Sequence, residues 1–321
     1  MTGSYIVSVD LGGTKILSAL LNSNNEIVSR VKVSTDIEKG SENLVGSISQ
    51  TVKKLLSDNN LQGNDIKAVA LGVPGTVNPL TGLIGSAPNL QITNFNIKDA
   101  LFNEVSIPVL IENDVNLAGL GIKKFELNES AKNILVVFVG TGIGGALFFD
   151  GKLYRGSTFY AGEIGHMLVE PKGEFSVYHN RATFEQTASR TAIVREIKRG
   201  LEKGKKSILK EYKSSKKQLK SKALADAIKK EDPLAVKCVS KAATTIGTVL
   251  GSITTLLNID TIVLGGGVIE AMSGFMNPLI KKSFEESVLK EPGEFVNIFE
   301  TKLGDDAALY GGAALAEELL K

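Results

Sequence analysis

The chain has 321 residues, a length that favours about two domains with cores of ordinary size. Its 37 basic and 35 acidic residues leave a net charge of +2, so no global field points to nucleic acid or to an anionic membrane. A single cysteine, Cys238, excludes intrachain disulfides and multi-cysteine metal sites. We expect a cytoplasmic protein with neither a signal peptide nor a membrane span.

The first part of the chain predicts an α/β unit. Residues 5–10 and 16–22 read as strands on either side of the glycine turn LGGTK, and residues 26–33 read as a third strand. Residues 41–60 place apolar side chains on one face of a helix. Buried strands follow at 66–73 and 107–112, and a helical pattern covers 115–125.

The opening pattern recurs at residues 133–154, again as strand, glycine turn and strand, which indicates an internal repeat. The alternative is that two buried hairpins carry glycines by chance. Residues 184–230 are helical and rich in lysine, which is more typical of a solvated face than of a nucleic-acid surface. A long apolar helix over 232–259, a strand ending in three glycines and a small-residue helix over 305–321 complete the pattern.

The glycine turns suit phosphate binding. Gly12 and Gly13 lack the spacing of a Walker loop, but a tight hairpin can present its backbone N–H groups to phosphate oxygens. Thr14 adds a hydroxyl and Lys15 a positive charge, while Asp10 could hold hydrated Mg²⁺. A second such turn carries Thr141 and Gly142. A third, Gly265, Gly266 and Gly267, follows a buried strand, where α/β sheets bind ligands.

Two polar segments remain open to different interpretations. Asn113 and Asp114 follow a buried strand and are either an ordinary helix N-cap or a catalytic carboxylate with its neighbour. Residues 162–185 carry both histidines, His166 and His179, together with Glu163 and Glu185. This stretch fits a metal site, an acid/base pair, a sugar clamp or a polar surface loop. Thr183 and Gln186 match a capping box for a helix beginning there.

Taken together, the motifs VDLGGTK, GVPG, APNL, ENDVN, GTGIGGA, AGEIGH and LGGG resemble the ROK family in order and spacing over nearly the whole chain. That family of sugar kinases and related repressors belongs to the actin-like ATPase superfamily, which includes hexokinase. The resemblance implies an α/β protein with two ribonuclease-H-like lobes and an interlobe cleft for ATP and sugar. It places the small lobe at residues 1–115 plus about 303–321, and the large lobe at 116–302.

The resemblance also implies roles for the site residues. Asp114 would be the catalytic base for a sugar hydroxyl. The remaining sugar contacts would be Gly75, Asn89, Asn113, Glu163, His166 and Glu185. The ATP contacts would be Asp10, Gly12, Gly13, Thr14, Lys15, Thr141, Gly142, Gly265, Gly266 and Gly267, with Asp10 holding Mg²⁺ through water.

One departure from the family pattern concerns zinc. Many ROK proteins follow Glu-x-x-His with a C-x-C-G-x-x-G-C-x-E segment whose three cysteines and histidine bind a structural zinc. The cysteine positions fall here on Ser176, Tyr178 and Thr183, and the terminal acid falls on Glu185. Hydroxyls are poor zinc ligands. We therefore expect no zinc, and a loop held by packing through Phe175, Tyr178 and Phe184 instead.

The expected function is ATP-dependent phosphorylation of a hexose, with glucose at its 6-hydroxyl as the first candidate. Fructose, an N-acetylhexosamine or allose are alternatives, because the clamp residues are shared. A repressor is disfavoured because the hairpin begins within ten residues of Met1, leaving no room for a DNA-binding helix-turn-helix. A non-catalytic sugar-binding protein is a third class. The resemblance suggests a homodimer or tetramer, while the sequence leaves the hexose and the phosphoryl donor open.

Overall fold

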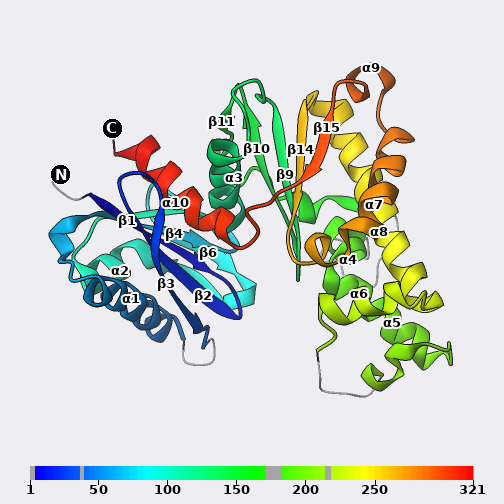
Figure 1. Ribbon diagram of the computed structural model, residues 1–321, viewed down its shortest axis with the longest axis horizontal. Helices are drawn as coiled ribbons and strands as arrows, with labels where there is room; N and C mark the ends of the chain where they lie inside the picture. The colour runs from blue at the N-terminus through cyan, green and yellow to red at the C-terminus, as the bar shows by residue number, and fades with distance from the viewer. Residues whose placement is uncertain (1–3, 37–39, 171–181, 214–217, 321) are drawn as a thin grey trace. The chain divides into compact units, whose positions relative to one another are not determined.

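The computed structural model describes residues 4–36, 40–170, 182–213 and 218–320 (Figure 1). The chain divides into two compact units. Unit 1 consists of Met1–Ser130, Leu153–Gly162 and Asp305–Lys321, and unit 2 of Ala131–Lys152 and Glu163–Gly304.

Unit 1 is built on a five-stranded sheet of order β3-β2-β1-β4-β8. Its strands are β1 (Tyr5–Leu11), β2 (Lys15–Leu21), β3 (Ile27–Ser34), β4 (Ile66–Val73) and β8 (Val109–Asn113). The first three strands form an antiparallel meander, whereas β4 and β8 run parallel to β1. The predicted hairpin around the LGGTK turn is therefore confirmed, and β1, β4 and β8 end at the same edge of the sheet.

Helices cover both faces of this sheet (Figure 1). Because side chains alternate along a strand, β2 turns Ile16 and Leu20 toward one core and Leu17 and Leu21 toward another. The first core is covered by α1 (Gly40–Asp58) and α2 (Ile97–Val105). The second face is covered by α3 (Asp114–Phe125) and α10 (Asp306–Leu319).

The contact between α3 and α10 depends on glycines. A Cβ on Gly311 would lie 1.8 Å from the carbonyl oxygen of Leu117, and one on Gly121 would lie 2.1 Å from that of Ala307. The two helix backbones therefore touch without side chains between them. This packing places all of α3 in unit 1, whose first segment extends to Ser130.

A small antiparallel sheet of unit 1 was not expected from the sequence. It consists of β5 (Thr76–Val77), β6 (Leu83–Ala87) and β7 (Ile92–Asn96). Two short 3₁₀ turns, η1 (Gly63–Asp65) and η2 (Pro88–Leu90), complete the unit. The strands are short and mix polar with apolar residues, which gives little periodic signal. Their position matters because β5 begins directly after Gly75 and η2 contains Asn89.

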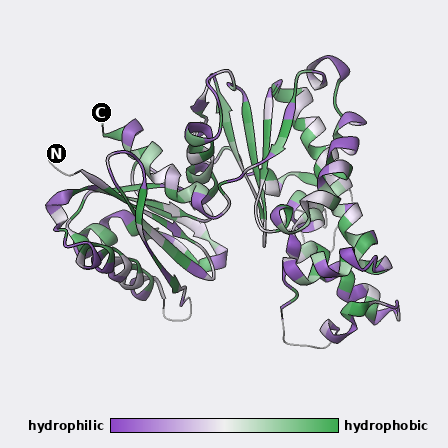
Figure 2. Cartoon of the chain, viewed as in Figure 1, coloured by the Kyte–Doolittle hydropathy of each residue, from purple (hydrophilic) through white to green (hydrophobic). Residues whose placement is uncertain are grey.

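Unit 2 has a second five-stranded sheet, of order β11-β10-β9-β14-β15. Its strands are β9 (Ile134–Val139), β10 (Ile143–Phe149), β11 (Lys152–Leu153), β14 (Thr261–Gly265) and β15 (Asn297–Glu300). Here too an antiparallel hairpin, β9 with β10, is followed by strands parallel to its first member. The two sheets thus share one topology, which supports the internal repeat. In Figure 2 their strands are largely hydrophobic.

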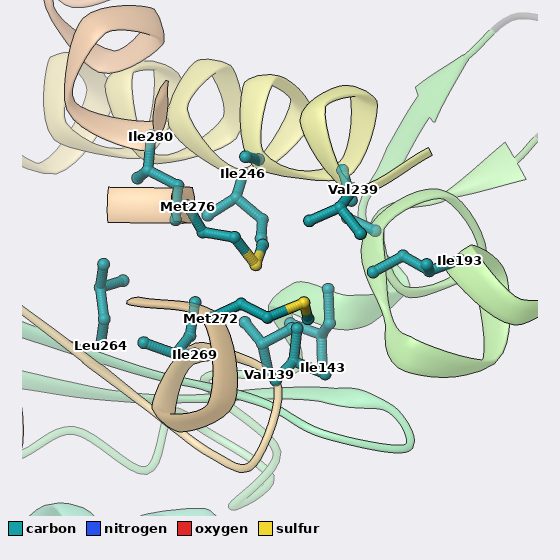
Figure 3. Packing of buried hydrophobic residues seen from close by; sticks show 14 of the residues in the cluster. Val139, Ile143, Ile193, Val239, Ile246, Leu264, Ile269, Met272, Met276 and Ile280 are labelled. Carbon is teal, nitrogen blue, oxygen red and sulfur yellow. The ribbon is translucent and has the colours of Figure 1, made fainter. Parts of the chain in front are cut away.

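The helices of unit 2 enclose its largest core. They are α4 (Phe184–Ala188), α5 (Arg190–Glu202), α6 (Ser221–Lys229), α7 (Pro233–Leu257), α8 (Ile269–Glu285) and α9 (Lys290–Gly293), with the 3₁₀ turns η3 (Ile164–His166) and η4 (Ile208–Tyr212). Figure 3 shows Met272 and Met276 of α8 lying between Ile246 of α7 and the strand residues Val139 and Ile143. Unbranched, flexible thioethers fill such irregular space well.

One expectation about this region is met. The half-buried Cys238 packs against the core as part of α7, which begins at a proline capped by Asp232. None of the helices in the described part of the chain is long and apolar enough to cross a membrane.

Candidate functional site: two sets of polar residues on two glycine hairpins

In unit 1, the turn between β1 and β2 is held by a backbone hydrogen bond and by one from a threonine hydroxyl. Gly12 donates its N–H to the carbonyl of Lys15 at 2.9 Å, and Thr35 donates its hydroxyl to the carbonyl of Gly12 at 2.7 Å. A Cβ on Gly13 would lie 3.3 Å from the carbonyl oxygen of Asn89. The expected phosphate turn and the expected sugar contact Asn89 are therefore neighbours in the same unit.

Charged groups gather beside this turn. Asp10, half-buried, is the next-to-last residue of β1, and burial raises its pKa to about 6, although Lys15 opposes that shift and Asp305 adds to it. The ammonium of Lys15 pairs with the carboxylate of Asp305. A partly desolvated carboxylate of this kind is stabilised by any cation placed next to it. Asp10 therefore fits the expected role beside hydrated Mg²⁺.

The junction of β8 with α3 brings three further residues together. Asn113 is the N-cap of α3, and its side-chain oxygen accepts N–H groups of Val115 at 2.9 Å and Asn116 at 3.1 Å. Its amide nitrogen donates to the carbonyl of Gly75 at 3.2 Å. Asp114, half-buried, is the first residue of α3. A capping role for Asn113 and a catalytic role for Asp114 are thus compatible, because the cap fixes the backbone position of Asp114.

Gly75 cannot be replaced by a larger residue without movement. Its φ is +89°, and a Cβ there would lie 2.2 Å from the carbonyl oxygen of Ser86 in β6. The close approach lets the Gly75 carbonyl reach the Asn113 amide. The small sheet that the sequence did not predict is therefore what supports this part of the site.

A buried ion pair stands directly before Asn113. The carboxylate of Glu112 is 1% exposed and accepts Nε of Arg155 at 2.6 Å, the N–H of Asn113 at 3.0 Å and Nδ2 of Asn116 at 3.1 Å. Arg155 reaches on to Glu318 of α10 at 3.0 Å. These residues were missed because Glu112 and Arg155 lie far apart in the sequence.

In unit 2, the expected sugar clamp is assembled on one loop and one helix start. Nε2 of His166 lies 3.8 Å from Oε2 of Glu163, on either end of η3. Burial raises the pKa of Glu163, with His166 opposing and Glu185 reinforcing the shift. His166 and Glu185 are therefore both close enough to Glu163 to act on its carboxylate, and the His166 side chain is largely exposed.

Glu185 connects the clamp to the second glycine turn. Its Oε2 accepts the N–H of Ile143 at 2.9 Å, and a Cβ on Gly142 would lie 2.1 Å from that same oxygen. A Cβ on Gly165, between Glu163 and His166, would lie 2.2 Å from the carbonyl of Ile143. Both glycines are needed for this close packing of loop, helix start and hairpin.

The capping box predicted at Thr183 and Gln186 is confirmed. Thr183 Oγ1 accepts the N–H of Gln186 at 3.3 Å, and the Gln186 side chain accepts the N–H of Thr183 at 3.1 Å. Strands β12 (Leu168–Glu170) and β13 (Ala182–Thr183) pair with each other just before this helix start, and Phe184 is fully buried.

The zinc question stays a prediction. Ser176, Tyr178 and His179, together with Phe175, lie outside the described residues. Among those that are described, no group of three or more His, Cys, Asp or Glu side chains could hold a metal ion.

The third glycine run lies beside the second turn. Gly265 pairs with Phe138 at the end of β9, and a Cβ on Gly266, whose φ is +89°, would lie 2.7 Å from the carbonyl of Val139. A Cβ on Gly267 would meet nothing within 4 Å. The expected nucleotide residues of unit 2 are thus at neighbouring strand ends, where α/β sheets bind ligands.

Comparison with known proteins finds a family and full-length relatives. A sequence model of the ROK family matches residues 6–319. Glucokinase from Halalkalibacterium halodurans is 32% identical over 319 residues, which are 99% of this chain and 96% of that protein. Glucokinase from Thermotoga maritima is 28% identical over 314 residues, 98% of this chain and 97% of that protein.

A solved structure gives the same result for the fold. The crystal structure of a ROK family glucokinase from Streptomyces griseus in complex with glucose and AMPPNP matches with a TM-score of 0.83 at 29% identity, covering 98% of this chain and 99% of that one. The predicted fold class, two α/β lobes of the actin-like ATPase type, is confirmed. The match of the family model over almost the entire sequence shows that the chain belongs to the ROK family.

Proposed function

We propose that this protein is a sugar kinase that transfers a phosphoryl group from ATP to a hexose, with glucose and its 6-hydroxyl as the preferred acceptor. Relatives named glucokinase, 28–32% identical over nearly the full length, support the kinase reaction. The observation that carries the proposal is the β8–α3 junction, where a helix cap fixes the half-buried Asp114 beside Asn113.

In the proposed reaction, the Asp114 carboxylate accepts the proton of the attacking sugar hydroxyl. Asn113 contributes orientation. Its oxygen is occupied by two backbone N–H groups and one amide hydrogen by Gly75, which leaves the second amide hydrogen for a neighbouring sugar hydroxyl. A capped, doubly anchored amide loses little freedom when it binds, which favours accurate placement of the acceptor.

The other sugar hydroxyls would be bound by Glu163, His166 and Glu185. Ionised carboxylates only accept hydrogen bonds, whereas a neutral imidazole can donate or accept, so the three offer different patterns to different hydroxyls. Glu185 has one oxygen held by the Ile143 N–H, and its other oxygen can accept a hydroxyl proton. Such a site discriminates against an epimer that leaves a buried group unpaired.

The nucleotide would be bound by the glycine turns of both units. Backbone N–H groups at Gly12, Gly13 and Gly142, with the hydroxyls of Thr14 and Thr141, would contact the phosphates, and the run at Gly265 would lie by the adenosine. Asp10 would hold Mg²⁺ through water, and that ion would neutralise charge on the transferred group. The ammonium of Lys15 is paired with Asp305, which offsets part of its charge but leaves further N–H groups for phosphate.

The test is Asp114→Asn measured beside Asp99→Asn. Asp99 is an exposed acid in the first turn of α2, so the control makes the same chemical change at another helix start of unit 1. We expect Asp114→Asn to lower kcat by about 10²–10⁴ while glucose binding by calorimetry persists. The control should keep normal turnover. Near-normal turnover by Asp114→Asn would contradict the assignment.

A coupled assay of ADP release across glucose, fructose, allose and N-acetylhexosamines decides the acceptor. The largest kcat/KM identifies the substrate. If no sugar is phosphorylated but glucose still binds, a non-catalytic sugar-binding role replaces the kinase.

A further inference from the structure

A guanidinium lies on the second glycine turn, although no motif in the sequence drew attention to it. Arg190 donates from an Nη to Oγ1 of Thr141 at 2.6 Å, and its backbone N–H bonds the carbonyl of Gly140 at 2.9 Å. The next residue, Thr191, donates its hydroxyl to the carbonyl of Thr141 at 2.7 Å. Two hydrogen bonds from Arg190 and one from Thr191 therefore fix the start of α5 to the turn expected to bind phosphate.

The position of Arg190 is unfavourable for a cation unless something compensates for it. It is the first residue of α5, directly after the N-cap Ser189, and the first turn of that helix has no acidic residue. A helix N-terminus repels positive charge, by about 0.3–1 kcal/mol at an exposed site. Among the described residues no carboxylate forms a salt bridge with Arg190. A positive charge held here without an anion indicates that the anion is a ligand.

The hydrogen bond from Arg190 also determines which further hydrogen bonds the Thr141 hydroxyl can make. Because the hydroxyl oxygen accepts the Arg190 N–H, its own hydrogen is directed elsewhere, and it makes no hydrogen bond to an acceptor within the described ranges. The exposed hydroxyl is therefore a donor toward solvent or a ligand. The guanidinium uses one of its five N–H groups on Thr141, which leaves several for the same ligand.

The turn needs this cation if it is to bind phosphate. Glu185 lies against Gly142 on the same turn and adds a negative charge that would repel the phosphate chain. Arg190, on the same turn, is the cation that would offset this repulsion for a phosphate bound there. Lys15, the other cation expected near phosphate, belongs to unit 1 and is paired with Asp305.

We propose that Arg190 binds the phosphate chain of the nucleotide, together with the hydroxyl of Thr141, and so sets the affinity of unit 2 for ATP over adenosine. This inference rests on the proposed kinase function, because it assumes that the ligand of the turn is a nucleoside triphosphate. It adds a binding residue that lies outside the glycine motifs.

The experiment compares Arg190→Ala and Arg190→Lys with Arg199→Ala. Arg199 is an exposed arginine in the last turn of the same helix, so its removal changes the charge equally but leaves the Thr141 turn intact. Isothermal titration measures binding of adenosine, ADP and the non-hydrolysable analogue AMPPNP to each variant, and of glucose as a reference.

We expect Arg190→Ala to weaken AMPPNP binding by about tenfold to a hundredfold, as for loss of a charged hydrogen bond, and to leave adenosine binding within twofold. ADP should show a loss no greater than AMPPNP. Arg190→Lys, which keeps the charge without the planar fork, should fall between Ala and wild type. Arg199→Ala should bind all ligands normally.

The inference is wrong if AMPPNP binding is unchanged in Arg190→Ala, or if adenosine loses as much affinity as AMPPNP, which would mean a purely structural role. If Arg190→Ala does not fold, Arg190→Lys carries the same comparison. Since binding is measured without turnover, a wild type that binds AMPPNP but phosphorylates no sugar would contradict the kinase proposal and leave this test in force.

Discussion

Replacing Arg155 by leucine should destabilise unit 1, because the buried carboxylate of Glu112 loses the cation that pairs with it. Glu112 is 1% exposed, and Arg155 is the cation that pairs with its Oε2 at 2.6 Å. Leucine fills part of the space of the arginine stem but offers no charge. Breaking a buried pair from one side typically costs about 3–5 kcal/mol, because the remaining ion stays desolvated.

The structure places the expected loss near the lower end of that range, at about 3 kcal/mol. The other oxygen of Glu112 keeps two hydrogen bonds, from the Asn113 N–H at 3.0 Å and from Asn116 at 3.1 Å, which continue to stabilise the carboxylate. The lost contact to Glu318 adds little, because that carboxylate is 41% exposed and such pairs contribute less than about 1 kcal/mol.

Urea unfolding followed by far-ultraviolet circular dichroism measures this loss, since the chain has no tryptophan to report by fluorescence. If the two units unfold in separate transitions, only that of unit 1 should move, and the other serves as an internal control. Glu112→Gln removes the charge, so the double variant Glu112→Gln with Arg155→Leu should recover at least about 1.5 kcal/mol relative to additivity. Strict additivity of the two single changes would refute the reasoning.

Two further predictions concern the glycine turns. Gly142→Ala should raise the KM for sugar at least about tenfold, because its Cβ displaces the Glu185 side chain from the N–H of Ile143. Gly140→Ala is the control and should behave as wild type, because its Cβ meets nothing within 4 Å. Equal KM values for the two variants would count against the proposed sugar clamp. Asp10, with its pKa raised from 3.8 to about 6, binds its proton more tightly in the folded chain, so it lowers stability as pH rises from about 4 to about 6. Asp10→Asn should therefore stabilise the protein by up to about 3 kcal/mol at pH 7.5 and hardly at all at pH 4, as measured by urea unfolding. A larger stabilisation at pH 4 than at pH 7.5 would exclude burial as the dominant effect on this carboxyl group.

Local patterns in the sequence predict the parts of the fold that depend on residues close together in the chain. The two hairpins, the long helix α7 and the caps at Asn113 and Thr183 each have a signal within a few positions. Contacts between distant positions have no such signal. The pairing of Arg155 with Glu112 and the support that β6 gives to Gly75 therefore became visible only in the structure.

Arg190 is an instructive case, because the sequence did hold a clue to it. An arginine immediately after a serine cap contradicts the preference of helix starts for acids, and a position that violates a local rule marks a candidate functional residue. The lysine-rich stretch near residues 203–222 is more conspicuous in the sequence, but its basic side chains in the described part of that stretch are exposed.

The docking of α10 has a consequence for how the protein is made. The apolar face formed by Leu17, Ala19 and Leu21 is covered by Leu309 and Ala313, which the ribosome adds only after the whole of unit 2 has been synthesised. During translation, the face of the first strands that α10 will cover therefore stays exposed to solvent, whereas all segments of unit 2 have already been synthesised. Unit 1, whose first residues leave the ribosome first, is therefore the last to complete its fold, and chaperones would bind it before α10 has docked.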